Sequence, residues 1–62
     1  MGYKIKEIRL ELRMSQEELS QKSGISRATI SGLESGRITV TTTGTLVKIA
    51  NAMGRNVSEI FF

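Results

Sequence analysis

Basic residues gathered in the middle of the chain are the first feature with a chemical consequence. Residues 22–48 carry four cations against the single anion Glu34, and these are Lys22, Arg27, Arg37 and Lys48. The flanking segments are each neutral, so the whole net charge of +3 lies in this stretch. Such an excess attracts a polyanion, although charge alone equally allows a solvated basic surface with no partner.

The residue types that are absent exclude most catalytic and metal chemistry. The 62 residues contain no His and no Cys, and all six acidic residues are Glu. Nucleophile–histidine catalysis is therefore excluded, and zinc or most transition metals would lack ligands. A general base could only be Glu, Lys or Tyr. We expect a protein that is not an enzyme and that has no metal or cofactor.

Length and hydropathy restrict the architecture and the location. A chain of 62 residues forms one domain, so residues 1–62 are expected to fold as a unit. No apolar run approaches the ~20 residues of a membrane span, and residues 1–13 lack the apolar core of a secretory signal. A cytoplasmic protein without a membrane partner is expected.

One predicted helix, over residues 27–35, has an unusual outer face. Ile30 and Leu33 would turn toward the core, and the opposite side carries only small residues, namely Ala28, Ser31, Gly32 and Ser35. Small side chains allow a helix backbone to approach another molecule closely. A DNA major groove, about 12 Å wide, admits such a helix, and Arg27 on its first turn could reach a base edge. A helix–helix contact in the fold or in a dimer is the alternative.

Capping residues and glycines delimit the central helices. Ser15 begins a capping box that starts a helix at Gln16, and Gly24 ends it. Ser26 then caps a helix from Arg27 to about Ser35, which stops at Gly36. Two short helices joined by a tight glycine turn over residues 16–35 form a helix-turn-helix arrangement.

The remaining apolar spacing predicts three more helices. Ile5, Ile8 and Leu12 indicate a first helix over about residues 3–12. Residues 37–43 are a loop, whose β-branched residues 38–41 could form a short extended segment. A fourth helix ends at Gly54, and a last short one follows. These two bury Leu46, Ile49, Ala50, Met53, Val57, Ile60 and Phe61. The prediction is an all-α fold of five helices.

Several spaced motifs occur together: Arg9, Ser15-Gln16-x-x-Leu19, Gly24-Ile25-Ser26, Thr29-Ile30-Ser31, Leu33-Glu34-Ser35-Gly36-Arg37, Leu46-x-x-Ile49-Ala50-x-x-Met53-Gly54 and Val57-x-Glu59-Ile60-Phe61. Over about residues 5–61 the chain thus resembles the phage-repressor/Cro, or XRE-like, family of DNA-binding domains. The resemblance implies a lambda-repressor-like five-helix bundle with its third helix in the major groove.

The resemblance also implies which residues contact DNA. Ser26, Arg27, Ala28 and Gly32 would face bases, and Ser31 joins them because it shares the small face. Ser15, Gln16, Ser35 and Arg37 would contact phosphates, with the hydroxyl of Thr42 as a further candidate in a threonine-rich stretch that lacks the family's usual proline. Arg9 and Glu34 match a pair of residues that forms a partly buried ion pair in the family. The residues alone equally allow two exposed charges that contribute little to stability.

The functional hypothesis is a sequence-specific DNA-binding transcriptional regulator, bacterial or phage-encoded and nucleoid-associated. It would bind a palindromic operator of double-stranded DNA, as a repressor and as a homodimer at least on DNA. Arg55, which stands where an apolar residue is usual, and Phe62 are candidates for the dimer contact. The alternative is a protein-interaction module, such as an antitoxin-like partner on the same fold.

Overall fold

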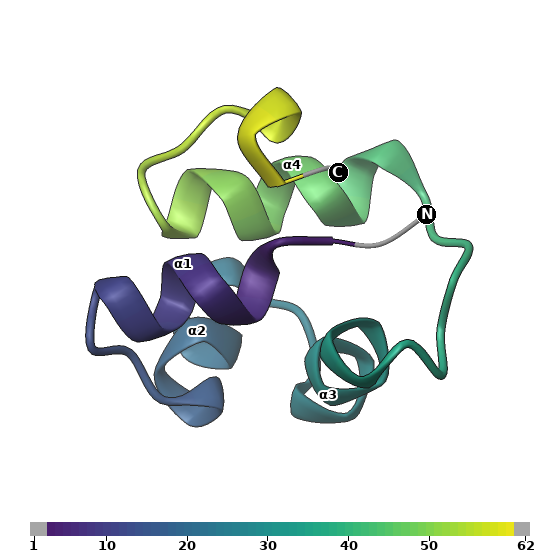
Figure 1. Cartoon of the computed structure of the whole chain (residues 1–62), viewed down its shortest axis with the longest axis horizontal. Helices are drawn as coiled ribbons and strands as arrows, with labels where there is room; N and C mark the ends of the chain where they lie inside the picture. Colours follow the sequence, from purple (N-terminus) through teal and green to yellow (C-terminus); the bar gives the residue numbers. More distant parts are fainter. Residues whose placement is uncertain (1–2, 61–62) are drawn as a thin grey trace.

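The computed structural model describes residues 3–60, which form four α-helices and one 3₁₀ helix (Figure 1). In chain order they are α1 (Ile5–Glu11), α2 (Gln16–Ser23), α3 (Arg27–Ser35), α4 (Thr43–Ala52) and η1 (Val57–Ile60). The all-α class is confirmed. The count of five α-helices is not, because a single 3₁₀ turn occupies the fifth position as far as residue 60 and Phe61 lies outside the described residues.

Local capping accounts for the boundaries of α2 and α3. The hydroxyls of Ser15 and Ser26 accept hydrogen bonds from backbone N–H groups three residues later, at 3.0 and 3.2 Å. Gly24 and Gly36 end the two helices with φ of +73° and +83°, a region open to glycine at little cost. These four predicted boundaries are confirmed.

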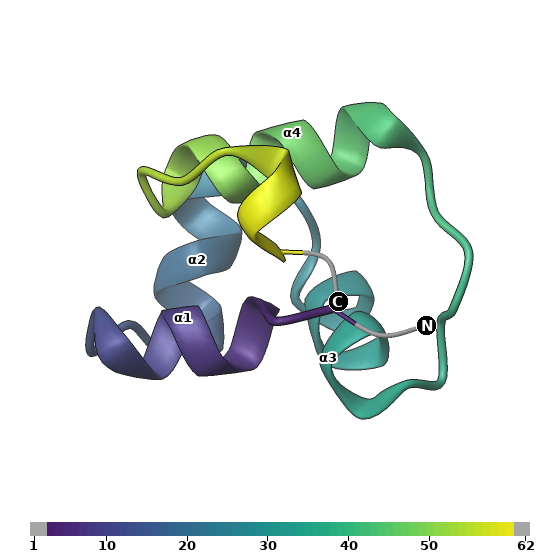
Figure 2. The same cartoon turned by 45° about the horizontal axis from the view of Figure 1, so that its top comes forward.

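The start of α4 follows the same rule. Thr42 is its N-cap, and its hydroxyl accepts from the N–H of Thr45 at 3.2 Å. The preceding residues, 38–42, have no regular secondary structure, so the extended segment does not form a strand. This loop arcs from α3 to α4 along one side of the molecule (Figures 1 and 2).

The first helix ends without a glycine. Arg13 takes a left-handed conformation with φ of +56°, the single non-glycine residue with positive φ within residues 3–60. The N–H of Met14 donates to the carbonyl oxygen of Arg9 at 3.0 Å across this turn. The turn brings Met14 back into the core, where 7% of its surface is exposed. α1 thus ends at Glu11 with Leu12 as its C-cap, within one residue of the predicted end, and it begins at Ile5, two residues later than predicted.

A single apolar core joins all five elements. Its buried members are Ile5, Ile8, Met14, Leu19, Ile30, Leu33, Leu46, Ile49, Ala50, Met53 and Ile60. η1 packs on α4 (Figure 2), and the N–H of Lys4 donates to the carbonyl oxygen of Ile60 at 2.8 Å. The two ends of the described chain are thereby held together.

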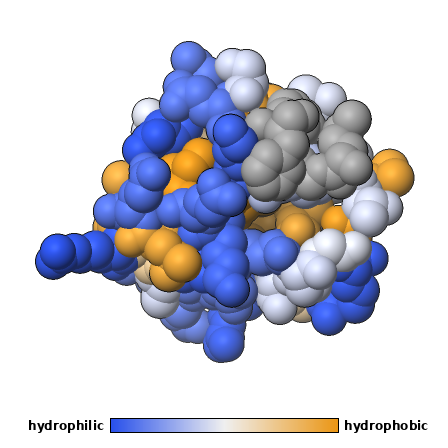
Figure 3. Space-filling model, in the orientation of Figure 1, coloured by the Kyte–Doolittle hydropathy of each residue, from blue (hydrophilic) through white to orange (hydrophobic). Residues whose placement is uncertain are grey.

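The face of the molecule seen in Figure 3 is largely hydrophilic, with separate apolar patches. Within residues 3–60 the exposed large apolar side chains are Leu10, Leu12, Val40 and Val47. In the part of the chain that is described, no helix is both long enough and apolar enough to span a bilayer.

Candidate nucleic-acid interface

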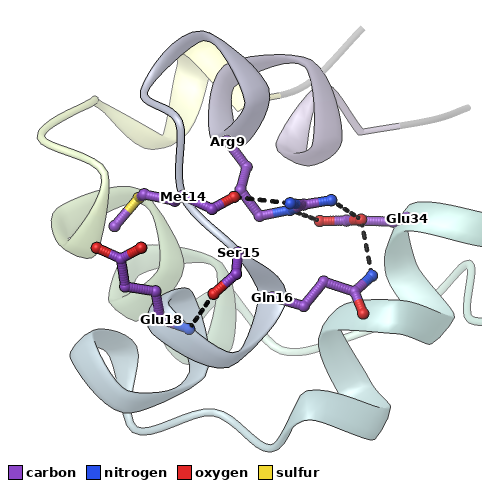
Figure 4. Close-up of polar contacts among 6 residues, drawn as sticks. All are labelled: Arg9, Met14, Ser15, Gln16, Glu18 and Glu34. Carbon is purple, nitrogen blue, oxygen red and sulfur yellow. Dashed lines mark hydrogen bonds and ion pairs between the residues drawn. The ribbon is translucent and has the colours of Figure 1, made fainter.

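A buried ion pair between α1 and α3 lies behind the helix-turn-helix. The Nε and Nη2 atoms of Arg9 donate to Oε2 and Oε1 of Glu34 at 2.8 and 3.0 Å (Figure 4). Arg9 Nη1 donates to the carbonyl oxygen of Met14 at 2.7 Å. The two side chains are 9% and 4% exposed. The pair implied by the resemblance is confirmed, and the alternative of two exposed charges is wrong.

The environment of Glu34 favours its charged form. Burial by itself would raise the pKa of its carboxyl group. Hydrogen bonds from Arg9 and Gln16, together with the positive charges of Arg9 and Lys6, outweigh burial and lower that pKa below its ordinary value. The hydrogen bond with Glu34 likewise raises the pKa of Arg9. The pair is therefore ionised at neutral pH.

Gln16, expected at a phosphate, extends this network at the start of α2. Its Nε2 donates to Oε1 of Glu34 at 3.0 Å, and the same amide nitrogen carries a second hydrogen. The neighbouring Ser15 accepts from the N–H of Glu18 and keeps a hydroxyl hydrogen to donate. The two side chains stand together at a helix N-terminus, where the helix dipole favours an anion.

A polar hollow opens beside this N-terminus. Its volume is about 210 Å³, and it is lined by Lys6, Arg9, Gln16, Ser31, Glu34 and Ser35. Sequence reasoning missed Lys6, although its i,i+3 spacing from Arg9 already placed it on the same side of α1. Ser31 and Ser35 of the small face border the hollow, so α3 and the start of α2 form one continuous polar surface.

The N-terminal end of α3 is open to solvent. Ser26, Arg27 and Ala28 are exposed, and Ser31 one turn later is half-buried. The hydroxyl of Ser26 is engaged in the helix cap, at 2.9 Å from that of Thr29. Nη1 of Arg27 lies 3.7 Å from Oε1 of Glu17, and both side chains are about two-thirds exposed. Such an exposed pair is worth at most ~1 kcal/mol, so Arg27 can leave it readily.

The placement of Gly32 on the exposed face is wrong. Gly32 is buried, because the side chain of Ile38 packs over it from the following loop. A Cβ atom on residue 32 would lie 2.5 Å from Cδ1 of Ile38, closer than real Cβ atoms approach. Gly32 therefore provides room for the loop, and its burial does not support the base contact expected for it.

The other predicted residues occupy different places. Ser35 and Thr42 are exposed, and the hydroxyl of Thr42 caps α4. Arg37 is exposed at the start of the loop after α3. Arg55 pairs with Glu11 of α1 at 3.3 Å and with Glu59 of η1 at 3.7 Å, so it links elements of its own chain. The other candidate for the dimer contact, Phe62, lies outside the described residues.

Comparisons with known proteins agree with this geometry. A family model described as Helix-turn-helix matches residues 5–60. An uncharacterized HTH-type transcriptional regulator from Methanothermobacter thermautotrophicus (strain Delta H) is 41% identical over 61 residues, covering 92% of this chain and 83% of its own length. No solved structure matches the chain. The chain belongs to the XRE-like helix-turn-helix family, and both matches support a DNA-binding regulator.

Proposed function

We propose that this protein is a sequence-specific transcriptional regulator that inserts α3 into the major groove of a palindromic operator. The observation that carries the proposal is the exposed start of α3 beside the polar N-terminus of α2. Helix-turn-helix proteins place the first turns of the second helix against base edges while the first helix meets the backbone. Both surfaces are open here.

Base contacts are assigned to the exposed residues of α3. Ser26, Arg27, Ala28 and Ser31 border the side that would enter the groove. A guanidinium group matches the O6 and N7 acceptors of guanine, so Arg27 is expected to specify a guanine once it leaves Glu17. Ala28 is short enough to touch a thymine methyl group.

Phosphate contacts are assigned to the polar groups around the start of α2 and α4. Ser15, Gln16 and Thr42 offer hydroxyl or amide groups at exposed or half-buried positions. The hydroxyl of Ser35 donates to the carbonyl oxygen of Gly32 at 3.2 Å and would have to rotate to donate to a phosphate. Lys6 joins them because it lines the same hollow as Gln16 and Ser35 and adds a positive charge there. Such contacts supply affinity and orientation without reading the sequence.

Operator selectivity requires two copies. One recognition helix contacts too few base pairs to select a site in a genome, whereas a two-fold dimer reads half-sites about 10 bp apart. We therefore propose a homodimer on DNA that represses by occupying the operator. The protein would be bacterial or phage-encoded, cytoplasmic and associated with the nucleoid.

Selection of bound sequences from a random DNA pool, followed by affinity measurements at several salt concentrations, tests the proposal. The selected motif should be palindromic, and log K should fall linearly with log salt, with a slope of about −0.9 for each neutralised phosphate. Absence of DNA binding at low salt, or a slope near zero, would reject DNA as the partner and favour the protein-interaction module.

A further inference from the structure

The chain reverses direction directly after α3 and runs back along that helix. Gly36, in the left-handed conformation, makes the turn. The N–H of Ile38 then donates to the carbonyl oxygen of Gly32 at 2.9 Å, and the N–H of Arg37 lies 3.3 Å from the hydroxyl oxygen of Ser35. The backbone N–H groups of residues 37 and 38 therefore hold this segment against the second half of α3.

This return path places the side chain of Arg37 beside the recognition helix. Nη2 of Arg37 lies 3.3 Å from the position that a Cβ atom on Gly32 would occupy. Gly32 is one helical turn after the exposed Ala28. The guanidinium group thus lies beside α3 at the level of Gly32, next to the Ile38 side chain that covers this glycine.

The donors of Arg37 are also unengaged. Within residues 3–60 its guanidinium group forms no ion pair or hydrogen bond. The guanidinium groups of Arg9, Arg27 and Arg55, by contrast, form ion pairs with glutamates. A guanidinium group carries five N–H donors, and all five are available to an external acceptor.

We infer that Arg37 is a second base-reading residue, which reaches along α3 next to Ile38 and contacts a guanine at a base pair different from that read by Arg27. The inference rests on the proposed insertion of α3 into the major groove. It replaces the phosphate contact that the resemblance implies for Arg37. The two arginines would then contact different base pairs. Arg27 would do so from the first turn of α3 and Arg37 from a position beside the second turn, with small residues between them.

The decisive experiment compares Arg37→Ala and Arg37→Gln on the selected operator and on all its single-base variants. Loss of a base contact should weaken binding roughly 5- to 150-fold per half-site and abolish the preference at one base pair. Arg37→Gln should shift that preference from guanine toward adenine, which glutamine pairs through N6 and N7. Because Arg37 is exposed, both variants are expected to fold, as circular dichroism will verify.

The outcomes separate this inference from the proposed function. If Arg37→Ala weakens all sequences alike and reduces the salt slope by about 1, Arg37 contacts a phosphate and the inference is rejected while DNA binding stands. If the unaltered protein binds no DNA, the proposed function itself fails. Lys22→Ala is the matched control, since it removes a cation of the same basic stretch from α2 and should leave the order of preferences unchanged.

Gly32→Ala provides a second test through the neighbouring residue. The added Cβ would press on Ile38 and crowd the guanidinium group of Arg37. We expect Gly32→Ala to weaken the preference at the same base pair as Arg37→Ala. In the double variant, Gly32→Ala should have no effect on this preference beyond that of Arg37→Ala. Additive effects at different base pairs would overturn the inference.

Discussion

Removal of the Glu34 carboxylate should cost this protein most of its stability. In Glu34→Ala the guanidinium group of Arg9, with only 9% of its side chain exposed, loses both charge-assisted hydrogen bonds. Breaking a buried pair in this way costs about 3–5 kcal/mol. A chain of 62 residues has a free energy of unfolding of roughly 3–9 kcal/mol at ~0.05–0.15 kcal/mol per residue.

Urea unfolding at pH 7, followed by far-ultraviolet circular dichroism, measures this loss. Small domains lose ~1–3 kcal/mol of stability per molar urea, so the midpoint should fall by one molar or more, or the variant should be unfolded in buffer. Lys22→Ala is the matched control. It breaks the Glu18–Lys22 pair, whose atoms are 3.9 Å apart and whose side chains are half exposed, and should cost less than about 0.5 kcal/mol.

Stability should recover in part when both charges of the pair are removed. Arg9→Met combined with Glu34→Leu leaves no buried charge without its partner, so the double variant should be more stable than Glu34→Ala. A loss below about 0.5 kcal/mol in Glu34→Ala would contradict the buried pair itself. A double variant no more stable than the single one would show that the cost arises from packing.

Three further predictions concern pH, strain and base recognition. The folded-state pKa of Glu34 is lowered, so the stabilisation that its carboxylate provides is complete above the ordinary carboxyl pKa and is lost as pH falls through the folded-state pKa. The free energy of unfolding, measured at decreasing pH, should show this loss, and in Glu34→Gln the decrease with pH should be smaller by the contribution of Glu34. Arg13→Gly relieves the positive φ and should raise stability by about 0.5–1 kcal/mol, or the melting temperature by several degrees, whereas an unchanged temperature would mean that the turn is unstrained. Arg27→Ala should cost about 1–3 kcal/mol per half-site and relax the preference at one base pair, so an unchanged order of preferences among single-base variants would refute the guanine assignment.

The helix boundaries were predictable because they depend on neighbours in the sequence. Ser15 and Ser26 satisfy N–H groups three residues away, and Gly24 and Gly36 supply the left-handed turns. Thr42 works in the same way at the start of α4, although the threonine-rich stretch left several candidates. No tertiary contact is needed for these caps.

The left-handed turn that follows α1 could not be predicted from local signals. The sequence offers no glycine there, and the apolar spacing extends to Leu12. The chain nevertheless turns at Arg13, because the turn brings Met14 into the core. Burial of this side chain outweighs the cost of the left-handed residue, and that balance is set by the other helices.

Residue types and spacing by themselves determined the class of fold, the position of the helix-turn-helix and the concentration of positive charge in residues 22–48. These depend on periodicity, on capping within three or four residues and on composition. Tertiary structure alone decided that Gly32 is covered, that Lys6 shares a hollow with Gln16 and Ser35, and that Arg37 lies along α3. A helical projection counts only the residues of one helix, whereas the exposed surface of α3 also depends on the loop that Gly36 turns back over it.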